Sequence, residues 1–246
     1  MSKYCIVIPV YNHGKELLQT LLELSCYNLR CFVVNDGSDH ETTYYLDEAK
    51  KIHDWIKIIS LQNNRGKGAA VKAGLRYACG QQYTHALQVD ADGQHCLEDI
   101  PKLLGESIKY PNALVLGQPI FSKDVPLSRL IGRQISRFWV CVETISKSIK
   151  DPLFGFRVYP LSSTVQVLDS NRTGNRMDFD PEIAVRLYWK NVPIRNVKTM
   201  VTYPDNGVSH FKMGRDNLQI SWMHTKLVLE MFYHLPASLW NRIKKP

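Results

Sequence analysis

Two acids follow an apolar run in the segment Leu87–His95. Asp90 and Asp92 are separated by one residue, and Gln94 comes two residues later. In an extended backbone, side chains at alternate positions share one face, so three oxygen-bearing groups would project together. Such hard oxygen donors suit Mg²⁺ or Mn²⁺, which usually leave room for the phosphate oxygens of a substrate. The competing interpretation is an ordinary Asp–Gly turn that carries two acids.

Apolar runs alternate with amphipathic segments through the first half of the chain, and this alternation would place the acids at the end of a strand. We expect strands at Tyr4–Val10, Cys31–Val34, Ile56–Ser60, His85–Asp90 and Ala113–Gly117. We expect helices at Lys15–Ser25, Glu41–His53, Ala69–Cys79 and Leu97–Tyr110. Regular alternation predicts a parallel sheet with helices on both faces. In such sheets ligands bind beyond the carboxyl ends of the strands.

Polar clusters lie at those carboxyl ends. They are Asn12–His13, Asn35–Ser38, Asn63–Lys67 and Asp90–Asp92. Four unrelated turns would not need to carry such chemistry on one edge, so their convergence predicts a binding site. Arg65 and Lys67 also lie beside glycines at a predicted helix start, where backbone N–H groups and cations favour phosphate. The alternative for this segment is a solvated loop.

The second half is less regular. Its predicted helices are Ser128–Ile149, Phe179–Lys190 and Met213–His234, with a short apolar segment at Phe154–Tyr159 and a strand at Val192–Tyr203. Asp178, Asp180 and Glu182 form an acidic cluster at a predicted helix start. Asp180 or Glu182 would serve as the general base for a hydroxyl acceptor, and the alternative is that these acids only cap the helix.

The chain has 246 residues and a formal net charge of +8, which favours an anionic partner such as a nucleotide or a phosphate-bearing lipid. The basic residues are scattered, so nucleic-acid binding is not expected. Arg129, Arg133 and Arg137 are spaced to share one helical stripe, which would either bind phosphate or form a solvated face. Six cysteines without a Cys-x-x-Cys pair indicate reduced thiols in a cytoplasmic protein.

No run of about 20 apolar residues occurs, so we expect no membrane-spanning segment. The C-terminal stretch Ile220–Ile243 mixes large apolar side chains with basic ones. It would either lie on a membrane surface or pack against the core as a final helix. No linker, repeat or low-complexity segment interrupts the chain, and a single domain over residues 1–246 is the simplest interpretation.

Six short motifs occur in order at Ile8–Asn12, Val34–Ser38, Asn64–Gly68, Asp90–His95, Asp151–Arg157 and Gly207–His210. Together they resemble the inverting family 2 glycosyltransferases, in particular the polyprenyl-phosphate sugar transferases such as the dolichol-phosphate mannose synthases. The resemblance implies an α/β nucleotide-diphospho-sugar transferase fold (GT-A, Rossmann-like), which is a three-layer sandwich with a mostly parallel central sheet. It also implies a nucleotide-sugar half at about 1–117, an acceptor half at about 118–215 and a C-terminal helical segment at 216–246.

The resemblance assigns roles to the residues singled out above. Those that would frame or contact the nucleotide sugar are Pro9, Tyr11, Asn12, Asp36, Arg65, Lys67, Asp90, Ala91 and Asp92. Those that would hold Mg²⁺ or Mn²⁺ are Asp90, Asp92 and Gln94. Those that would be catalytic are Asp92, Asp180, Glu182 and Arg133. In the resembling family the metal ion neutralises charge on the departing nucleoside diphosphate.

The reaction implied is transfer of a sugar, with inversion, from a nucleotide-diphosphate donor to a polyprenyl phosphate or another lipid. We expect it in the cytoplasm, with peripheral contact at the inner face of a membrane. Two departures from the family pattern keep alternatives open. Gln118 and Pro119 follow Gly117 where the family often has an arginine, and His210 stands where lipid-phosphate transferases often have a lysine. The alternatives are a non-catalytic nucleotide-sugar-binding protein of the same fold and, ranked lower, a nucleotidyltransferase.

Overall fold

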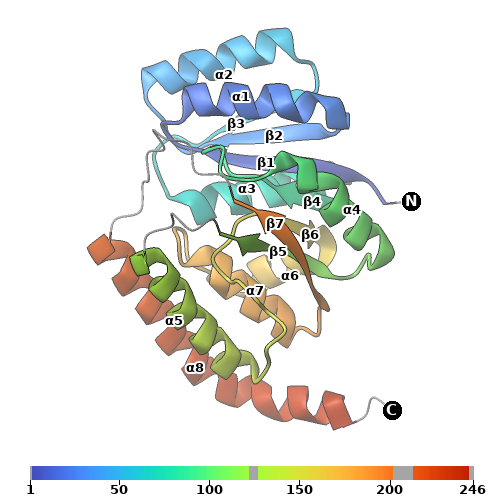
Figure 1. Ribbon diagram of the computed structural model, residues 1–246, viewed down its shortest axis with the longest axis vertical. Coiled ribbons are helices and arrows are strands. Elements are labelled where there is room, and N and C mark those ends of the chain that lie inside the picture. The colour runs from blue at the N-terminus through green and yellow to red at the C-terminus, as the bar shows by residue number, and fades with distance from the viewer. Residues whose placement is uncertain (1, 122–126, 202–212, 244–246) are drawn as a thin grey trace.

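A seven-stranded sheet forms the centre of the molecule (Figure 1). The computed structural model describes residues 2–121, 127–201 and 213–243. The strands are β1 (Tyr4–Val10), β2 (Arg30–Asn35), β3 (Ile56–Ser60), β4 (His85–Gln88), β5 (Leu114–Ile120), β6 (Arg157–Pro160) and β7 (Ile194–Met200). Their order across the sheet is β3-β2-β1-β4-β6-β5-β7. β6 runs antiparallel to both of its neighbours, whereas the other pairs are parallel.

Helices cover both faces of this sheet (Figure 1). One face carries α1 (Gly14–Leu24), α2 (His40–Ile52) and α4 (Ile100–Lys109). The other carries α3 (Lys67–Gly80), α6 (Leu161–Ser170) and α7 (Phe179–Trp189), with α5 (Leu127–Thr144) and α8 (Met213–Ile243) side by side next to α7. Short 3-10 turns occupy Ser25–Tyr27 and Leu97–Asp99. The predicted three-layer α/β sandwich with a mostly parallel sheet is confirmed.

β1 shows why the sequence adopts this architecture. Cys5 and Val7 pack into the layer of α3, α6 and α7, whereas Ile6 and Ile8 pack into the layer of α1, α2 and α4. All four side chains are fully buried. A strand covered on both faces needs apolar side chains at every position rather than at alternate ones. The unbroken apolar run therefore predicts its central place in the sheet.

Asp90 and Asp92 lie where the chain leaves β4 and turns, and the expectation of a strand that continues through Asp90 was wrong. β4 ends at Gln88, and the chain turns at Ala91–Asp92. Gly93 has a φ of 70°, which glycine adopts without strain. The Gln94 N–H donates to Asp92 Oδ1 at 3.1 Å, so the aspartate closes the turn with its own side chain.

Two further differences have local causes. α5 ends at Thr144 rather than at the predicted Ile149, because Ile145 has a left-handed φ of 47°. α6 was not predicted, since its serine- and threonine-rich sequence has modest helix propensity. The apolar segment expected near residues 154–159 supplies the antiparallel strand β6.

No helix in the described part of the chain is both long and apolar enough to cross a bilayer. The motif Gly207–His210, including His210, lies outside the described residues, as do Tyr203 and the side chain of Arg129.

Candidate active site

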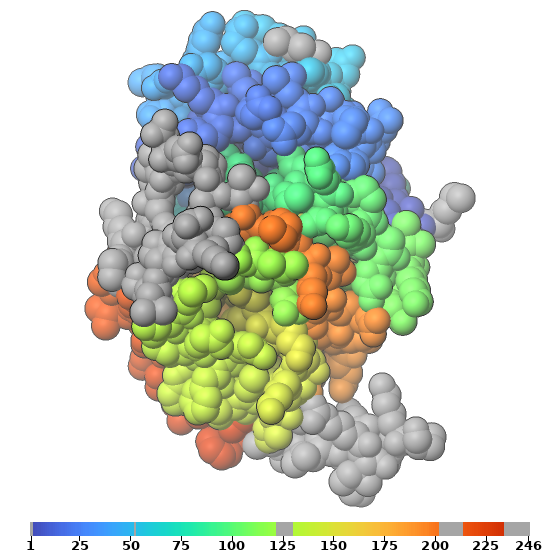
Figure 2. Space-filling model, viewed as in Figure 1, coloured from blue at the N-terminus to red at the C-terminus, as the bar shows by residue number. Residues whose placement is uncertain are grey.

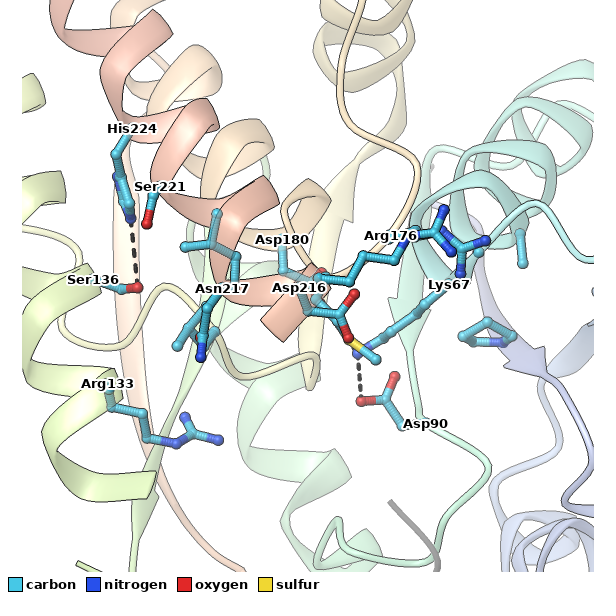
Figure 3. A pocket seen from close by; sticks show the side chains of 18 of the residues that line it. Lys67, Asp90, Arg133, Ser136, Arg176, Asp180, Asp216, Asn217, Ser221 and His224 are labelled. Atoms are coloured by element: carbon cyan, nitrogen blue, oxygen red, sulfur yellow. Dashed lines mark hydrogen bonds and ion pairs between the residues drawn. The ribbon is translucent and has the colours of Figure 1, made fainter. Parts of the chain in front are cut away.

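A cavity of about 1370 Å³ opens beyond the carboxyl ends of β1, β2 and β4 and continues between α5 and α8 (Figure 3). The sequence-predicted site residues in its wall are Pro9, Tyr11, Asp36, Lys67, Asp90, Ala91, Asp92, Gln94, Arg133 and Asp180. Segments from both halves of the chain therefore meet at one site. Asn12, Arg65 and Glu182 are not part of the wall.

Asp36 follows β2 and organises the loop before α3. Its carboxylate accepts hydrogen bonds from the N–H groups of Arg65 at 2.8 Å and Gly66 at 2.7 Å. Burial raises the pKa of Asp36, although these two backbone bonds act to lower it. The Arg65 side chain is exposed, so this residue contributes its backbone to the site, and its placement does not support the predicted phosphate contact. Asn12 is likewise used locally, because its Oδ1 accepts from the Asp39 N–H at 2.9 Å.

Lys67 joins the two halves of the site (Figure 3). Its Nζ lies 2.8 Å from Asp90 Oδ2 and 3.1 Å from Asp180 Oδ2. Burial opposes the charge on Lys67, but the two carboxylates raise its pKa well above the usual value. Burial likewise opposes the charge on Asp90, yet Lys67 and His95 lower its pKa to about 2. Lys67 and Asp90 are therefore both charged at neutral pH.

A buried hydrogen-bonded chain orients Asp90. The Tyr159 hydroxyl donates to Gln88 Oε1 at 3.0 Å, and Gln88 Nε2 donates to Asp90 Oδ1 at 3.1 Å. The Asp90 N–H donates to His95 Nδ1 at 3.2 Å, which leaves the proton of a neutral imidazole on Nε2. Burial lowers the pKa of His95, although Asp90 and Asp92 act to raise it. The His95 ring stacks on Phe156 at 4.7 Å between centroids, so this histidine packs beneath the site.

The acids of the turn fit a shared metal ion. Asp92 and Gln94 line the cavity beside Asp90, and carboxylate and amide oxygens are the donors that Mg²⁺ and Mn²⁺ prefer. Among the described residues, no three His, Cys, Asp or Glu side chains are grouped so that they would hold a metal by themselves. An ion held by these donors would therefore need water and substrate oxygens to complete its coordination.

Asp180 is one of the acids of the second half that line the cavity. It is 3% exposed, and its Oδ1 has no hydrogen-bond partner within the described residues. Arg157 Nη1 lies 3.8 Å from this oxygen. The fully buried guanidinium of Arg157 donates to the backbone oxygens of Pro152, Phe154 and Asp180 at 2.6, 2.7 and 2.6 Å, so it fastens the start of α7 to the loop before β6.

Glu182 has a different environment, although it is only two residues further on. Its carboxylate accepts from the Gly174 N–H at 2.7 Å and from Arg186 Nε at 2.8 Å, and it pairs with Lys226 at 3.2 Å. These partners occupy both of its oxygens. Glu182 therefore holds α7, α8 and the preceding loop together, and its predicted role as a general base stays a prediction.

Arg133 lies in the cavity wall on α5 but is already paired. Its Nη1 is 2.8 and 2.7 Å from the two oxygens of Asp151, and its guanidinium lies over the Phe121 ring at 5.1 Å. A phosphate would have to share this arginine with Asp151, so the predicted phosphate contact stays a prediction. Arg137 is not part of the wall.

Several wall residues were not singled out in the sequence (Figure 3). Arg176 lies in the loop between α6 and α7, and Asp216 lies at the start of α8. His224 contacts Glu143 through Nδ1 at 2.7 Å and Ser136 through Nε2 at 3.4 Å. These residues come from segments without a recognisable motif, and no local signal marks them.

Comparison with known proteins agrees with this geometry. Residues 5–164 match the family model described as Glycosyl transferase family 2. An uncharacterized protein of Methanocaldococcus jannaschii is 30% identical over 83% of this chain and 90% of its own length. A human dolichyl-phosphate beta-glucosyltransferase is 25% identical over 87% of this chain and 74% of its length. A UDP-N-acetylglucosamine–dolichyl-phosphate N-acetylglucosaminyltransferase of Methanococcus voltae is 24% identical over 79% and 85%.

Solved structures show the same fold. Glucosyl-3-phosphoglycerate synthase of Mycobacterium tuberculosis, crystallised with Mn²⁺, UDP-glucose and phosphoglyceric acid, aligns with a TM-score of 0.65 at 14% identity, over 100% of this chain and 81% of that one. TarS of Staphylococcus aureus with UDP-GlcNAc aligns with a TM-score of 0.60 at 16% identity, over 92% and 66%. The fold, the cavity and a family match over well over half of the sequence agree, and the chain belongs to glycosyl transferase family 2, which confirms the prediction of a glycosyltransferase.

Proposed function

We propose that this glycosyltransferase moves a sugar from a nucleotide-diphosphate donor to a polyprenyl phosphate, with inversion at the anomeric carbon. One observation carries the proposal: a single cavity joins Asp36, Lys67 and Asp90 at the strand ends to Asp180 and to an apolar wall between α5 and α8. Relatives named for dolichyl-phosphate acceptors support it, and one of them is named for a UDP-sugar donor. UDP-sugars are therefore the first donors to test.

The donor occupies the strand-end half of the cavity in this proposal. Asp36 faces the cavity with carboxylate lone pairs beyond the two used by backbone N–H groups, which suits hydroxyl or N–H donors of a nucleoside. Lys67 and Arg176 supply positive charge for the diphosphate. A Mg²⁺ or Mn²⁺ ion held by Asp92, with Asp90 and Gln94, would stabilise negative charge on the leaving group as a Lewis acid.

The displacement needs little further chemistry from the protein. An acceptor oxygen attacks the anomeric carbon from the face opposite the leaving nucleoside diphosphate, the bond between this carbon and the diphosphate oxygen breaks, and the nucleoside diphosphate leaves with the electron pair. A phosphate acceptor is already an anionic nucleophile and needs no base. A lipid hydroxyl would have to lose a proton, and Asp180, which lines the cavity, is our candidate to accept it.

The acceptor half of the cavity, as we assign it, combines apolar side chains with polar ones such as Ser136, Ser221 and His224. Its wall between the two helices contains Ile131, Ile135, Trp139, Ile220, Val228 and Leu229. An isoprenoid chain would bury its hydrocarbon surface here while its phosphate points toward the cations of the donor half. The size of the cavity accommodates both ligands, because single small-molecule sites usually occupy about 300–1,000 Å³.

A bilayer surface is the partner that we propose for the exposed apolar side chains of α5 and α8, three of which (Ile131, Ile135 and Leu229) also line the cavity. On α8, Leu218, Trp222, Leu229 and Tyr233 share one helical stripe and are 62–86% exposed. On α5, Ile131, Ile135 and Phe138 are 51–62% exposed, and this helix forms the lower front of the surface in Figure 2. Large exposed apolar patches on a chain of net charge +8 suit an anionic membrane. The cavity opens between the same helices, so an acceptor would enter it from the lipid.

Turnover tests the reaction. The purified chain is incubated with UDP-glucose, UDP-GlcNAc or GDP-mannose and with citronellyl phosphate, in Mn²⁺ or in EDTA, and nucleoside diphosphate release is measured. We expect release that requires acceptor and metal and that is lost in Asp92→Asn but not in Asp47→Asn, which changes an exposed acid on α2. Nucleotide-sugar binding without turnover would favour the non-catalytic alternative. Absence of both from a folded sample would refute the proposal.

Vesicle flotation tests the membrane contact. We expect the chain to float with vesicles rich in phosphatidylglycerol and Trp222→Gln to reduce the bound fraction. Leu22→Gln is the matched control, because Leu22 is also a large exposed apolar residue (57% exposed, against 70% for Trp222) but lies on α1, in the opposite layer. Equal loss in both variants, or no binding by the wild type, would refute the assignment of this face.

A further inference from the structure

Lys72 lies on α3, near Lys67, but it does not reach the cavity. Its ammonium faces the loop between α6 and α7 instead. Nζ is 2.6 Å from Asn175 Oδ1, 2.8 Å from the Gly174 carbonyl oxygen and 3.0 Å from the Thr173 carbonyl oxygen. A lysine ammonium has three N–H donors around one compact charge, and three consecutive residues of the loop supply the acceptors.

The same loop is held against α3 from a second direction. The Ala69 N–H donates to the Asn175 carbonyl oxygen at 2.9 Å. Gly66 leaves no room for a side chain, since a Cβ there would lie 2.5 Å from that same oxygen. A Cβ at Gly68 would lie 2.4 Å from Phe179 Cβ. The start of α3 and residues 173–179 are therefore packed as one unit.

This unit carries charged groups of the cavity on both sides. Lys67 projects from the α3 side, whereas Arg176 comes from the loop and Asp180 from the helix that follows it (Figure 3). Burial lowers the pKa of Lys72, although Glu182 acts to raise it. The loop acceptors compensate for this partly buried charge, and replacing the ammonium with an apolar group would remove the hydrogen bonds that tie these part-buried and exposed acceptors to α3.

We propose that Lys72 is a positioning residue that holds residues 173–175 so that Arg176 faces the donor diphosphate beside Lys67. The inference rests on the proposed function, because it assigns Arg176 to the nucleotide sugar. Lys72 touches neither substrate and acts through the loop. Removing the Lys72 ammonium therefore changes donor affinity only through the displacement of Arg176.

A double-mutant cycle measures this dependence. The affinity of whichever of UDP-glucose, UDP-GlcNAc or GDP-mannose the wild type binds is measured by calorimetry for Lys72→Met, Arg176→Ala and the double variant. Lys72→Met should weaken binding about tenfold, as expected for loss of a charged hydrogen-bond set. In the Arg176→Ala background the same change should add little, because coupled sites are not additive. Arg76→Met is the matched control, since Arg76 is another cation on α3 but pairs with the exposed Asp169 of α6 and not with the loop that follows it.

Hydrogen exchange gives a readout that needs no ligand. The Gly174 and Arg176 N–H groups bond to Glu182 and Asp178, and Lys72→Met should speed their exchange while leaving α2 unchanged. If Lys72→Met fails to fold, Asn175→Ala removes one acceptor and should produce a smaller change of the same sign. Unchanged exchange in the loop, or affinity losses that multiply in the double variant, would overturn the inference. A wild type that binds no nucleotide sugar would refute the proposed function and with it the role given to Arg176.

Discussion

The Lys67 ammonium forms ion pairs with two carboxylates, those of Asp90 and Asp180, and replacing Lys67 with methionine tests the electrostatics of the site. The Asp90 and Asp180 side chains are only 17% and 4% exposed. The pKa of Asp90 falls from an ordinary 3.8 to about 2 in the folded protein, because Lys67 and His95 outweigh the effect of burial. At about 1.36 kcal/mol per pKa unit, this difference corresponds to about 2 kcal/mol of stability at neutral pH. We expect Lys67→Met to lower the free energy of unfolding by roughly 2–3 kcal/mol.

The pH dependence of this loss has a definite sign. A carboxyl group with a depressed pKa stabilises the fold fully above its unfolded value near 3.8, and the contribution is lost as pH falls toward 2. Without Lys67, burial raises the pKa of Asp90, and protonation then relieves the buried charge. Urea unfolding followed by tryptophan fluorescence should show the largest deficit near pH 7.5 and a smaller one near pH 4.5.

Two comparisons isolate the cause. Lys51→Met removes an exposed ammonium 2.7 Å from Glu48, and we expect no pH-dependent loss from it. Adding Asp90→Asn to Lys67→Met removes one unpaired charge and should restore part of the stability. A loss below about 0.5 kcal/mol, which is typical of surface changes, or an equal loss at both pH values would refute the reasoning.

The packing of α3 and the buried acid of α5 give two further predictions. Gly68→Ala should lower the free energy of unfolding by about 1–3 kcal/mol, because the new Cβ would lie 2.4 Å from Phe179 Cβ. A Cβ at Gly80 meets no atom within 4 Å, so Gly80→Ala should be neutral or stabilising. Thermal unfolding distinguishes the two variants. Burial raises the pKa of Glu143 despite its contact with His224. This acid therefore stabilises the fold below its ordinary pKa of 4.5 and loses that contribution as pH rises. Glu143→Gln should accordingly lose less stability than the wild type between about pH 5 and 8. Parallel curves of unfolding free energy against pH for the two proteins would argue against the buried acid.

Local patterns were enough for much of the first half of the chain. The apolar run at Tyr4–Val10 is observed as β1, because a strand buried on both faces requires such a run. Asp36, Lys67 and Asp90 were expected at one edge and do line one cavity, since parallel strands bring their carboxyl ends together. The family motifs predicted the same site, and the residues matched by the family model, 5–164, include the first five of the six motifs, the last of them Asp151–Arg157.

Patterns failed where a single backbone conformation decided the outcome. Asp90 and Asp92 were expected on one face of a strand, but Gly93 and the side chain of Asp92 turn the chain there. The two acids still reach the cavity, because a turn at the strand end faces the same edge of the sheet. Ile145 likewise ends α5 earlier than its amphipathic pattern suggested.

Asp180 and Glu182 show what could not be predicted from the sequence. Both are acids in the first turn of α7, and by residue type and spacing either would serve as a base. Lys67 from α3 reaches one, whereas Lys226 from α8 reaches the other. The sequence alone determined which kinds of side chain arrive at the edge of the sheet. Only the tertiary structure decided which of them face the cavity, because their partners come from distant segments whose approach no local pattern encodes.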